Sequence, residues 1–218
     1  MTPDSPKPWS HPLAKGLPTL GSEIEQRSRQ IIAGQLAGMD FDETALPVIR
    51  RVVHATADVS FAESLRVHPE ALERGAAALR DRKPILCDVR MVQAGITRTD
   101  SDVICRISDE EVIRAAHSAH TTRAAAAMEL LADRMDGAIV AIGNAPTALW
   151  KVLELAGTGR ARPAVVVGLP VGFVGASESK QALLESDLCY ITNVGPRGGS
   201  PVAAAAVNAL ALAAREAK

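Results

Sequence analysis

The chain has 218 residues, of which 47% are hydrophobic and only 3% aromatic, a length that suits one α/β domain or two very small ones. Its 24 basic residues nearly balance its 25 acidic residues, which argues against binding nucleic acid or a membrane surface through bulk charge. Three widely spaced cysteines give neither a disulfide framework nor a zinc motif, and the longest apolar stretch, residues 164–176, is too short to span a bilayer. We therefore expect a cytoplasmic protein without a bound metal.

The N-terminal part of the chain divides into an arm and a helical segment. Residues 1–18 are rich in proline and polar side chains and predict a flexible arm, so that residues 19–218 form the folded domain. Ser22 and Glu25 have the spacing of a capping box, which predicts that a helix begins at Ser22. Further helices are expected over 43–54, ending near His54, and from Pro69 to about Asp81.

Buried strands and helices alternate over the rest of the chain. Strands are expected at 84–89, 103–107, 137–143, 163–170 and 188–192, and helices at 109–117, 121–135, 146–156, 177–186 and 200–216. This alternation predicts an α/β fold, a single domain with a mostly parallel sheet covered by helices on both faces and preceded by a helical N-terminal segment.

Three segments combine a buried strand, a glycine-rich turn and a helix start: residues 142–147, 168–180 and 193–200. The carboxyl ends of parallel strands meet at one edge of a sheet, where free N–H groups at helix starts suit anionic ligands. Glycines that only permit tight turns are the other explanation. None of the three is a nucleotide motif, since Lys180 follows Ser179 rather than a glycine, so neither ATP nor NAD is expected.

Among the five histidines, His54 has the fewest ordinary explanations. It ends an apolar helix, whereas the other four lie in the arm, near a helix start or at a turn between helices. Histidine is the side chain best suited to proton transfer near neutral pH. A histidine buried in the core is the alternative.

Four segments of the chain resemble the precorrin-8X methylmutase family: residues 85–98, 143–149, 170–180 and 198–210. The resemblance implies an isomerase of cobalamin biosynthesis that moves a methyl group from C-11 to C-12 of a corrinoid, with no cofactor. It implies a homodimer that exchanges substrate and product with neighbouring pathway enzymes. It makes His54 the catalytic residue, and it indicates the following substrate-binding residues: Ser28, Thr97, Arg98, Arg123, Asn144, Gly175, Ser179, Lys180, Arg197, Gly198 and Gly199.

Two positions depart from the family pattern. Arg29 follows Ser28 where the family usually has an aromatic residue, and Pro196 replaces an arginine of the last glycine-rich loop. Two other classes of function remain open from the residues alone. One is an α/β enzyme that acts on a phosphorylated metabolite, and the other is a non-catalytic corrinoid carrier.

Overall fold

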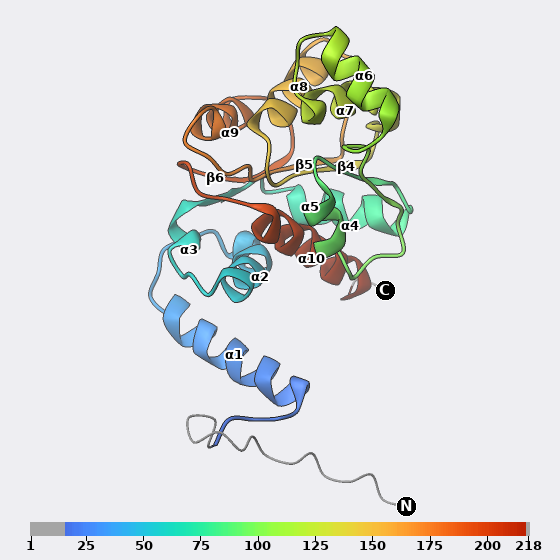
Figure 1. Cartoon of the computed structure of the whole chain (residues 1–218). Coiled ribbons are helices and arrows are strands. Elements are labelled where there is room, and N and C mark those ends of the chain that lie inside the picture. Colours follow the sequence, from blue (N-terminus) through green and yellow to red (C-terminus); the bar gives the residue numbers. More distant parts are fainter. Residues whose placement is uncertain (1–15, 217–218) are drawn as a thin grey trace, which may run out of the picture.

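The computed structural model describes residues 16–216 and confirms an α/β fold in three layers (Figure 1). Most of the predicted arm, residues 1–15, lies outside the described residues. The central sheet has six strands in the order β1-β6-β5-β4-β2-β3, and only β1 is antiparallel to its neighbour. The strands are β1 (Leu65–Val67), β2 (Ile85–Cys87), β3 (Val103–Ile104), β4 (Ile139–Ile142), β5 (Val165–Gly168) and β6 (Tyr190–Asn193).

Helices cover both faces of the sheet. One layer holds α2 (Leu46–Thr56), α3 (Phe61–Ser64), α4 (Ala71–Arg80), α5 (Arg90–Gly95) and α10 (Ser200–Glu216). The other holds α6 (Glu110–Ser118), α7 (Arg123–Glu129), α8 (Pro146–Gly157) and α9 (Ala176–Leu184). Short 3-10 turns, η2 (Glu43–Ala45) and η3 (Ala132–Arg134), precede α2 and follow α7.

The strand residues explain why both faces must be covered. Successive side chains of a strand point to opposite faces, and here both sets are apolar. In β2, Ile85 and Cys87 pack in the core beneath α10, while Leu86 packs in the core on the other side. The strands therefore bury both of their faces, which places the functional surface at strand ends or on the helical layers.

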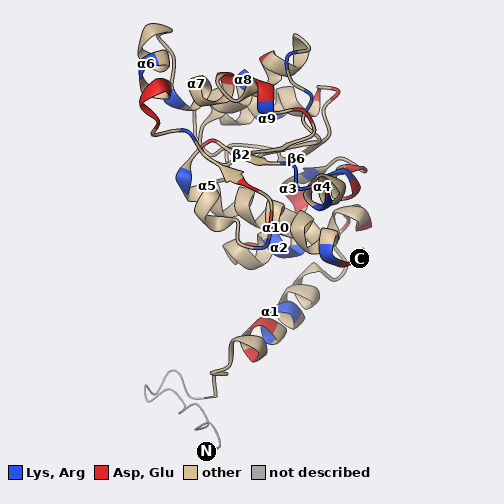
Figure 2. Cartoon of the chain, turned by 90° about the vertical axis from the view of Figure 1, so that its right-hand side faces the viewer, with Lys and Arg blue, Asp and Glu red and all other residues tan. Residues whose placement is uncertain are grey.

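Helix α10 is the centre of one layer, and its small side chains allow close packing. A Cβ added at Gly95 of α5 would lie 2.7 Å from Ala204 of α10. A Cβ added at Gly75 of α4 would lie 2.6 Å from Leu210. Most of α10 carries no charged side chain, as the tan ribbon in Figure 2 shows. This packing fixes α2, α4 and α5 around one buried helix.

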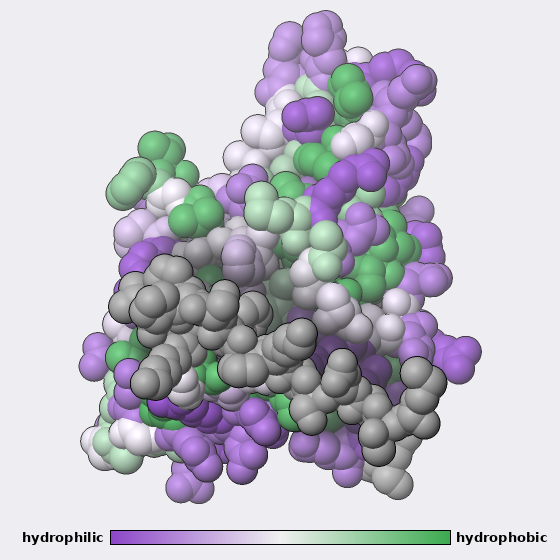
Figure 3. Space-filling model, turned by 60° about the horizontal axis from the view of Figure 1, so that its bottom comes forward, coloured by the Kyte–Doolittle hydropathy of each residue, from purple (hydrophilic) through white to green (hydrophobic). Residues whose placement is uncertain are grey.

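Helix α1 (Gly21–Leu36) projects from the main body and approaches it beside α2 (Figure 1). Figure 3 turns the lower end of Figure 1 toward the viewer, and the described residues that it leaves uncovered include both hydrophilic and hydrophobic side chains. No helix between residues 16 and 216 is long and apolar enough to cross a membrane.

Several predicted elements differ from the observed ones. Helix α1 begins at Gly21, and its N-cap Leu20 has no side-chain cap, so the predicted capping box at Ser22 is wrong. The prediction missed β1, α3 and α5, which are only 3, 4 and 6 residues long and carry little periodicity. The predicted helix over 121–135 ends at Glu129 and continues as a turn and η3.

Candidate active site

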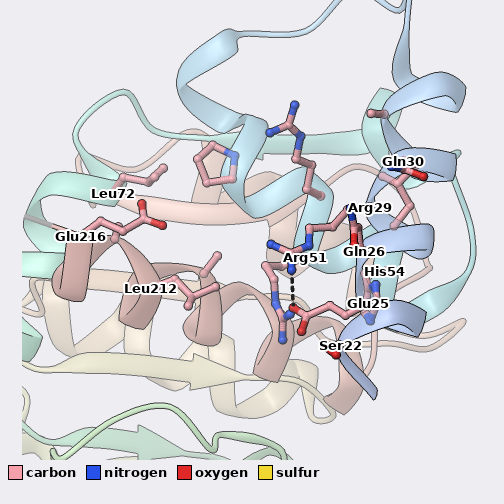
Figure 4. Close-up of a pocket in the computed structure, with 16 residues that line it drawn as sticks. Ser22, Glu25, Gln26, Arg29, Gln30, Arg51, His54, Leu72, Leu212 and Glu216 are labelled. Carbon is pink, nitrogen blue, oxygen red and sulfur yellow. Dashed lines mark ion pairs between the residues drawn. The ribbon is translucent and has the colours of Figure 1, made fainter. Parts of the chain in front are cut away.

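A cavity of about 930 Å³ lies between α1, α2 and the last turns of α10. This volume is near the upper end of the range for small-molecule sites, so the cavity is large enough for a bulky ligand. Figure 4 shows side chains of α1 and α2 facing one another across it, with Leu72, Leu212 and Glu216 on the opposite wall. Its lining combines mainly apolar groups from α4 and α10, with the carboxylate of Glu216 at the end of α10, and mainly charged and amide groups from α1 and α2.

His54 lines this cavity from the last turn of α2. The apolar face of α2, made by Val48, Ile49, Val52 and Val53, is buried against the core, which turns His54 away from it. The side chain is exposed rather than buried. The explanation of His54 as a core histidine is therefore wrong, and its imidazole is accessible to a ligand in the cavity.

Three arginines line the same cavity, and none was selected as a binding residue from the sequence. Arg29 comes from α1, where it lies 3.8 Å from Glu25, and Arg50 and Arg51 come from α2. Arg51 precedes His54 by three residues, so both lie on one side of α2. This spacing was the signal available in the sequence.

At the edge of the sheet, the turn after β4 is occupied by a carboxylate of the chain itself. The strand order reverses between β2 and β4, which is where open α/β proteins usually bind ligands. Here Asp88, directly after β2, accepts hydrogen bonds from the backbone N–H groups of Gly143 (3.1 Å), Asn144 (2.8 Å) and Ala145 (2.8 Å). Burial raises the pKa of Asp88, and these hydrogen bonds oppose the increase. The prediction that this turn offers free N–H groups to a ligand is wrong.

The other two glycine-rich loops are bonded to each other. The N–H of Gly172 donates to the carbonyl of Pro196, and the N–H of Gly199 donates to the carbonyl of Leu169. Gly198 has no room for a side chain, since an added Cβ would lie 2.4 Å from the carbonyl oxygen of Leu169. The predicted Gly198 and Gly199 thus have a clear packing function in joining the ends of β5 and β6.

Lys180 is buried beneath these loops. Its ammonium group donates to Asn193 Oδ1 at 3.1 Å and to the carbonyl of Arg197 at 2.5 Å. Burial lowers the pKa of Lys180 to about 8. Ser179, also buried, donates to the carbonyl of Ala176 within α9. Neither predicted binding residue presents its polar group at an open surface.

Arg197 connects the loop after β6 to the segment that follows His54. Its guanidinium forms an ion pair with Asp58, donates to Ser60 Oγ at 2.5 Å and lies 4.5 Å above the ring of Phe61. Hydrogen bonds from Ser60 are the main cause that lowers the pKa of Asp58. The predicted carboxylate-binding group of Arg197 therefore already has a carboxylate partner, four residues beyond His54.

The remaining predicted binding residues lie in three places. Ser28 is half-buried on α1 but does not line the cavity. The N–H of Thr97 donates to Asn208 of α10, and Arg98 lines a second pocket of about 80 Å³ beside Arg215. Arg123 is exposed at the start of α7, and the Asn144 side chain is exposed. Gly175, with a φ of 79°, is the N-cap residue directly before α9. Between residues 16 and 216, no three His, Cys, Asp or Glu side chains cluster as metal ligands.

The fold and the cavity define an α/β protein with a large pocket between α1, α2 and α10, and known proteins give its class. A family model described as precorrin-8X methylmutase matches residues 23–213. The precorrin-8X methylmutase of Pseudomonas aeruginosa is 44% identical over 199 residues, which cover 88% of this chain and 95% of that protein. The cobalt-precorrin-8 methylmutase of Priestia megaterium is 40% identical over 205 residues, which cover 92% of this chain and 91% of that protein.

A solved structure gives the same answer. The precorrin-8X methyl mutase of Thermus thermophilus matches the fold with a TM-score of 0.82 at 38% identity, covering 90% of this chain and 98% of that one. These proteins are isomerases that catalyse a methyl migration. The chain belongs to the precorrin-8X methylmutase family.

Proposed function

We propose that this protein moves a methyl group from C-11 to C-12 of precorrin-8X, or of its cobalt-containing counterpart, in cobalamin biosynthesis. The observation that carries the proposal is the 930 Å³ cavity in which His54 lies among apolar side chains and three arginines. A corrinoid precursor is a broad apolar ring fringed with acetate and propionate groups. An apolar wall with cationic groups beside it suits both parts of such a ligand.

His54 is the residue that we expect to transfer the proton. The reaction breaks the bond from the methyl group to C-11 and forms a bond to C-12, and all atoms of the substrate remain in the product. Protonation of a ring nitrogen by His54 polarises the conjugated system during the migration, and the proton returns when the product forms. Such general acid catalysis contributes about 10²–10⁴-fold to a rate. The walls of the cavity supply the rest by holding the ring in its reactive shape.

Anaerobic incubation with precorrin-8X, followed by visible absorption, tests this function. Many turnovers per protein to a red-shifted product support the proposal, and a parallel incubation with the cobalt-containing substrate identifies the preferred form. A spectral change that stops at one equivalent indicates a carrier instead. No change with either substrate contradicts the proposal. A phosphorylated metabolite is less well supported, since Asp88 already occupies the helix start nearest the strand reversal.

We also propose that the protein acts as a cytoplasmic homodimer that passes its product to the next enzyme. Helix α1 and the residues before it carry Leu17, Leu20, Ile24 and Ile31, and each of these side chains is about half exposed. Exposed apolar side chains on a projecting helix are typical of a surface that contacts another chain. Light scattering is expected to give twice the monomer mass for the unmodified protein. The double variant Ile24→Glu, Ile31→Glu is expected to give a mass closer to that of the monomer. A monomeric unmodified protein would contradict the dimer.

A further inference from the structure

Arg51 has an unusual environment on the wall of the His54 cavity. Its Nε atom is buried and has no hydrogen-bond partner in the described part of the chain. Buried donors in folded proteins nearly always have a partner, and an exception needs an explanation such as a ligand that completes the site. Ser101 Oγ is the other such atom between residues 16 and 216, and it does not line the cavity.

The charges around Arg51 indicate which kind of partner is missing. Burial is the main cause that lowers the pKa of Arg51, and the positive charges of Arg98 and Arg29 act in the same direction. Glu25 opposes them, but it forms its ion pair with Arg29. No carboxylate among residues 16–216 lies within ion-pair distance of Arg51. A guanidinium keeps its proton in such surroundings, so the site lacks an anion.

The location of Arg51 relates this missing anion to the reaction. Arg51 and His54 are three residues apart on α2, a spacing at which side chains of a helix are neighbours. Figure 4 shows both side chains on the same side of the cavity, facing Glu25 and Gln26 of α1. A guanidinium binds a carboxylate through two parallel hydrogen bonds, which fixes the orientation of the ligand as well as its position.

We propose that Arg51 binds one of the peripheral carboxylates of the corrinoid and thereby sets which edge of the ring faces His54. This inference rests on the proposed function, since it takes the carboxylated ring as the ligand of the same cavity. Arg50 is the natural comparison, because it lines the same cavity from the adjacent position but its side chain is exposed. The unpartnered and partly buried guanidinium of Arg51 is the one expected to distinguish a carboxylate from a neutral group.

Affinity for two corrinoids tests the inference. The probes are hydrogenobyrinic acid, which carries free carboxylates, and a corrinoid whose side chains are all amidated, with affinities read from absorption. We expect Arg51→Gln to weaken binding of the acid about 10–100-fold, the value of one charge-assisted contact. Binding of the amidated ring is expected to change less than threefold. Arg50→Gln is expected to weaken binding of the acid less than Arg51→Gln does.

A stability measurement separates binding from a structural role. Removing a buried charge that has no partner does not destabilise a protein, so ligand-free Arg51→Gln should unfold at the same or a higher urea concentration. Loss of stability in this variant, or an equal loss of affinity for both corrinoids, would overturn the inference. Unchanged affinity of the variant would overturn it also, while turnover by the unmodified protein would leave the proposed function standing. An unmodified protein that neither converts nor binds a corrinoid would overturn both.

Discussion

The His54 cavity and the loops at the carboxyl edge of the sheet both contain charged and polar residues, but these residues differ in whether they have partners within the chain. At the sheet edge, Asp88 fills the turn after β4, Lys180 bonds the loop after β6, and Arg197 is paired with Asp58. In the cavity, His54 is exposed and Arg51 keeps a buried Nε without a partner. The first region uses its polar groups to hold the fold together, whereas the second leaves them available to a ligand.

A polar group that has no partner within the chain is the better indication of a ligand-binding site. A group that is already satisfied must break a hydrogen bond to meet a ligand, so binding gains little from it. A buried group without a partner gains the full value of a contact when a ligand arrives. The carboxyl edge of the sheet, where ligands of open α/β proteins usually bind, is therefore the less favourable of the two regions here.

The largest expected effect is that of His54→Ala on turnover. Loss of the proton donor is expected to lower the rate about 10²–10⁴-fold, while corrinoid binding and stability stay near those of the unmodified protein. Initial rates of product absorption provide the measurement. His117→Ala is the matched control, since His117 is also exposed in the last turn of a helix but lies on α6. A rate within threefold of normal for His54→Ala would exclude it from the mechanism.

Asp88→Ala should show the opposite pattern, a loss of stability rather than of chemistry. The change removes the acceptor of three backbone N–H groups at the start of α8, and we expect the free energy of unfolding to fall by about 3 kcal/mol. Urea unfolding monitored by circular dichroism provides the measurement. Asp187→Ala, at an exposed position, is the control and should change stability by less than about 0.5 kcal/mol. An Asp88→Ala variant of normal stability would contradict a structural role.

Unfolding of Lys180→Met at several pH values tests whether burial of the Lys180 ammonium group makes the stability of the fold depend on pH. Burial lowers the pKa of Lys180 from 10.5 to about 8, so the unfolded chain binds more protons than the folded one between these values. Stability of the unmodified protein should therefore rise relative to Lys180→Met, by about 1–2 kcal/mol, as pH increases through this interval. Urea unfolding at pH 7, 9 and 10 measures the difference.

Lys151→Met is the control for that series. The pKa of Lys151 is raised rather than lowered, mainly by its hydrogen bond to Glu154. The stability of the unmodified protein relative to Lys151→Met should therefore not rise with pH. Parallel stability curves for Lys180→Met and the unmodified protein would show that burial of Lys180 has no effect on its protonation.

The sequence predicted the layers of the fold well because their signals are local. Runs such as residues 137–143 and 163–170 are apolar at every position, which indicates strands buried on both faces, and β4 and β5 lie within them. His54 was also accessible to prediction, since it ends an apolar helix. The short antiparallel strand β1 could not be predicted, because its three residues become a strand only by pairing with β6 near the other end of the chain.

The roles of the polar residues could not be predicted because their partners are distant in sequence. Asp88 meets Gly143 across 55 positions, and Arg197 meets Asp58 across 139. Without the fold, the turn after β4 has free N–H groups and Arg197 is an unpaired cation. Conversely, Arg51 is one of two adjacent arginines on a helix, which usually indicates a solvated face. Only the tertiary structure shows which of these charges has a partner.

The smallest effect is expected for Arg197→Met. This variant tests the difference between the two regions directly, because the family resemblance indicates Arg197 as a binding residue whereas the structure pairs it with Asp58. Its ion pair with Asp58 is about half exposed, with side-chain exposures of 47% and 41%, so its loss should lower stability only slightly. A double-mutant cycle with Asp58→Asn should give a similarly small coupling energy. Because the guanidinium is already engaged, KM should rise less than threefold. A tenfold increase in KM with unchanged stability would place the substrate at the sheet edge after all, and the satisfied groups there would then exchange their partners for the ligand.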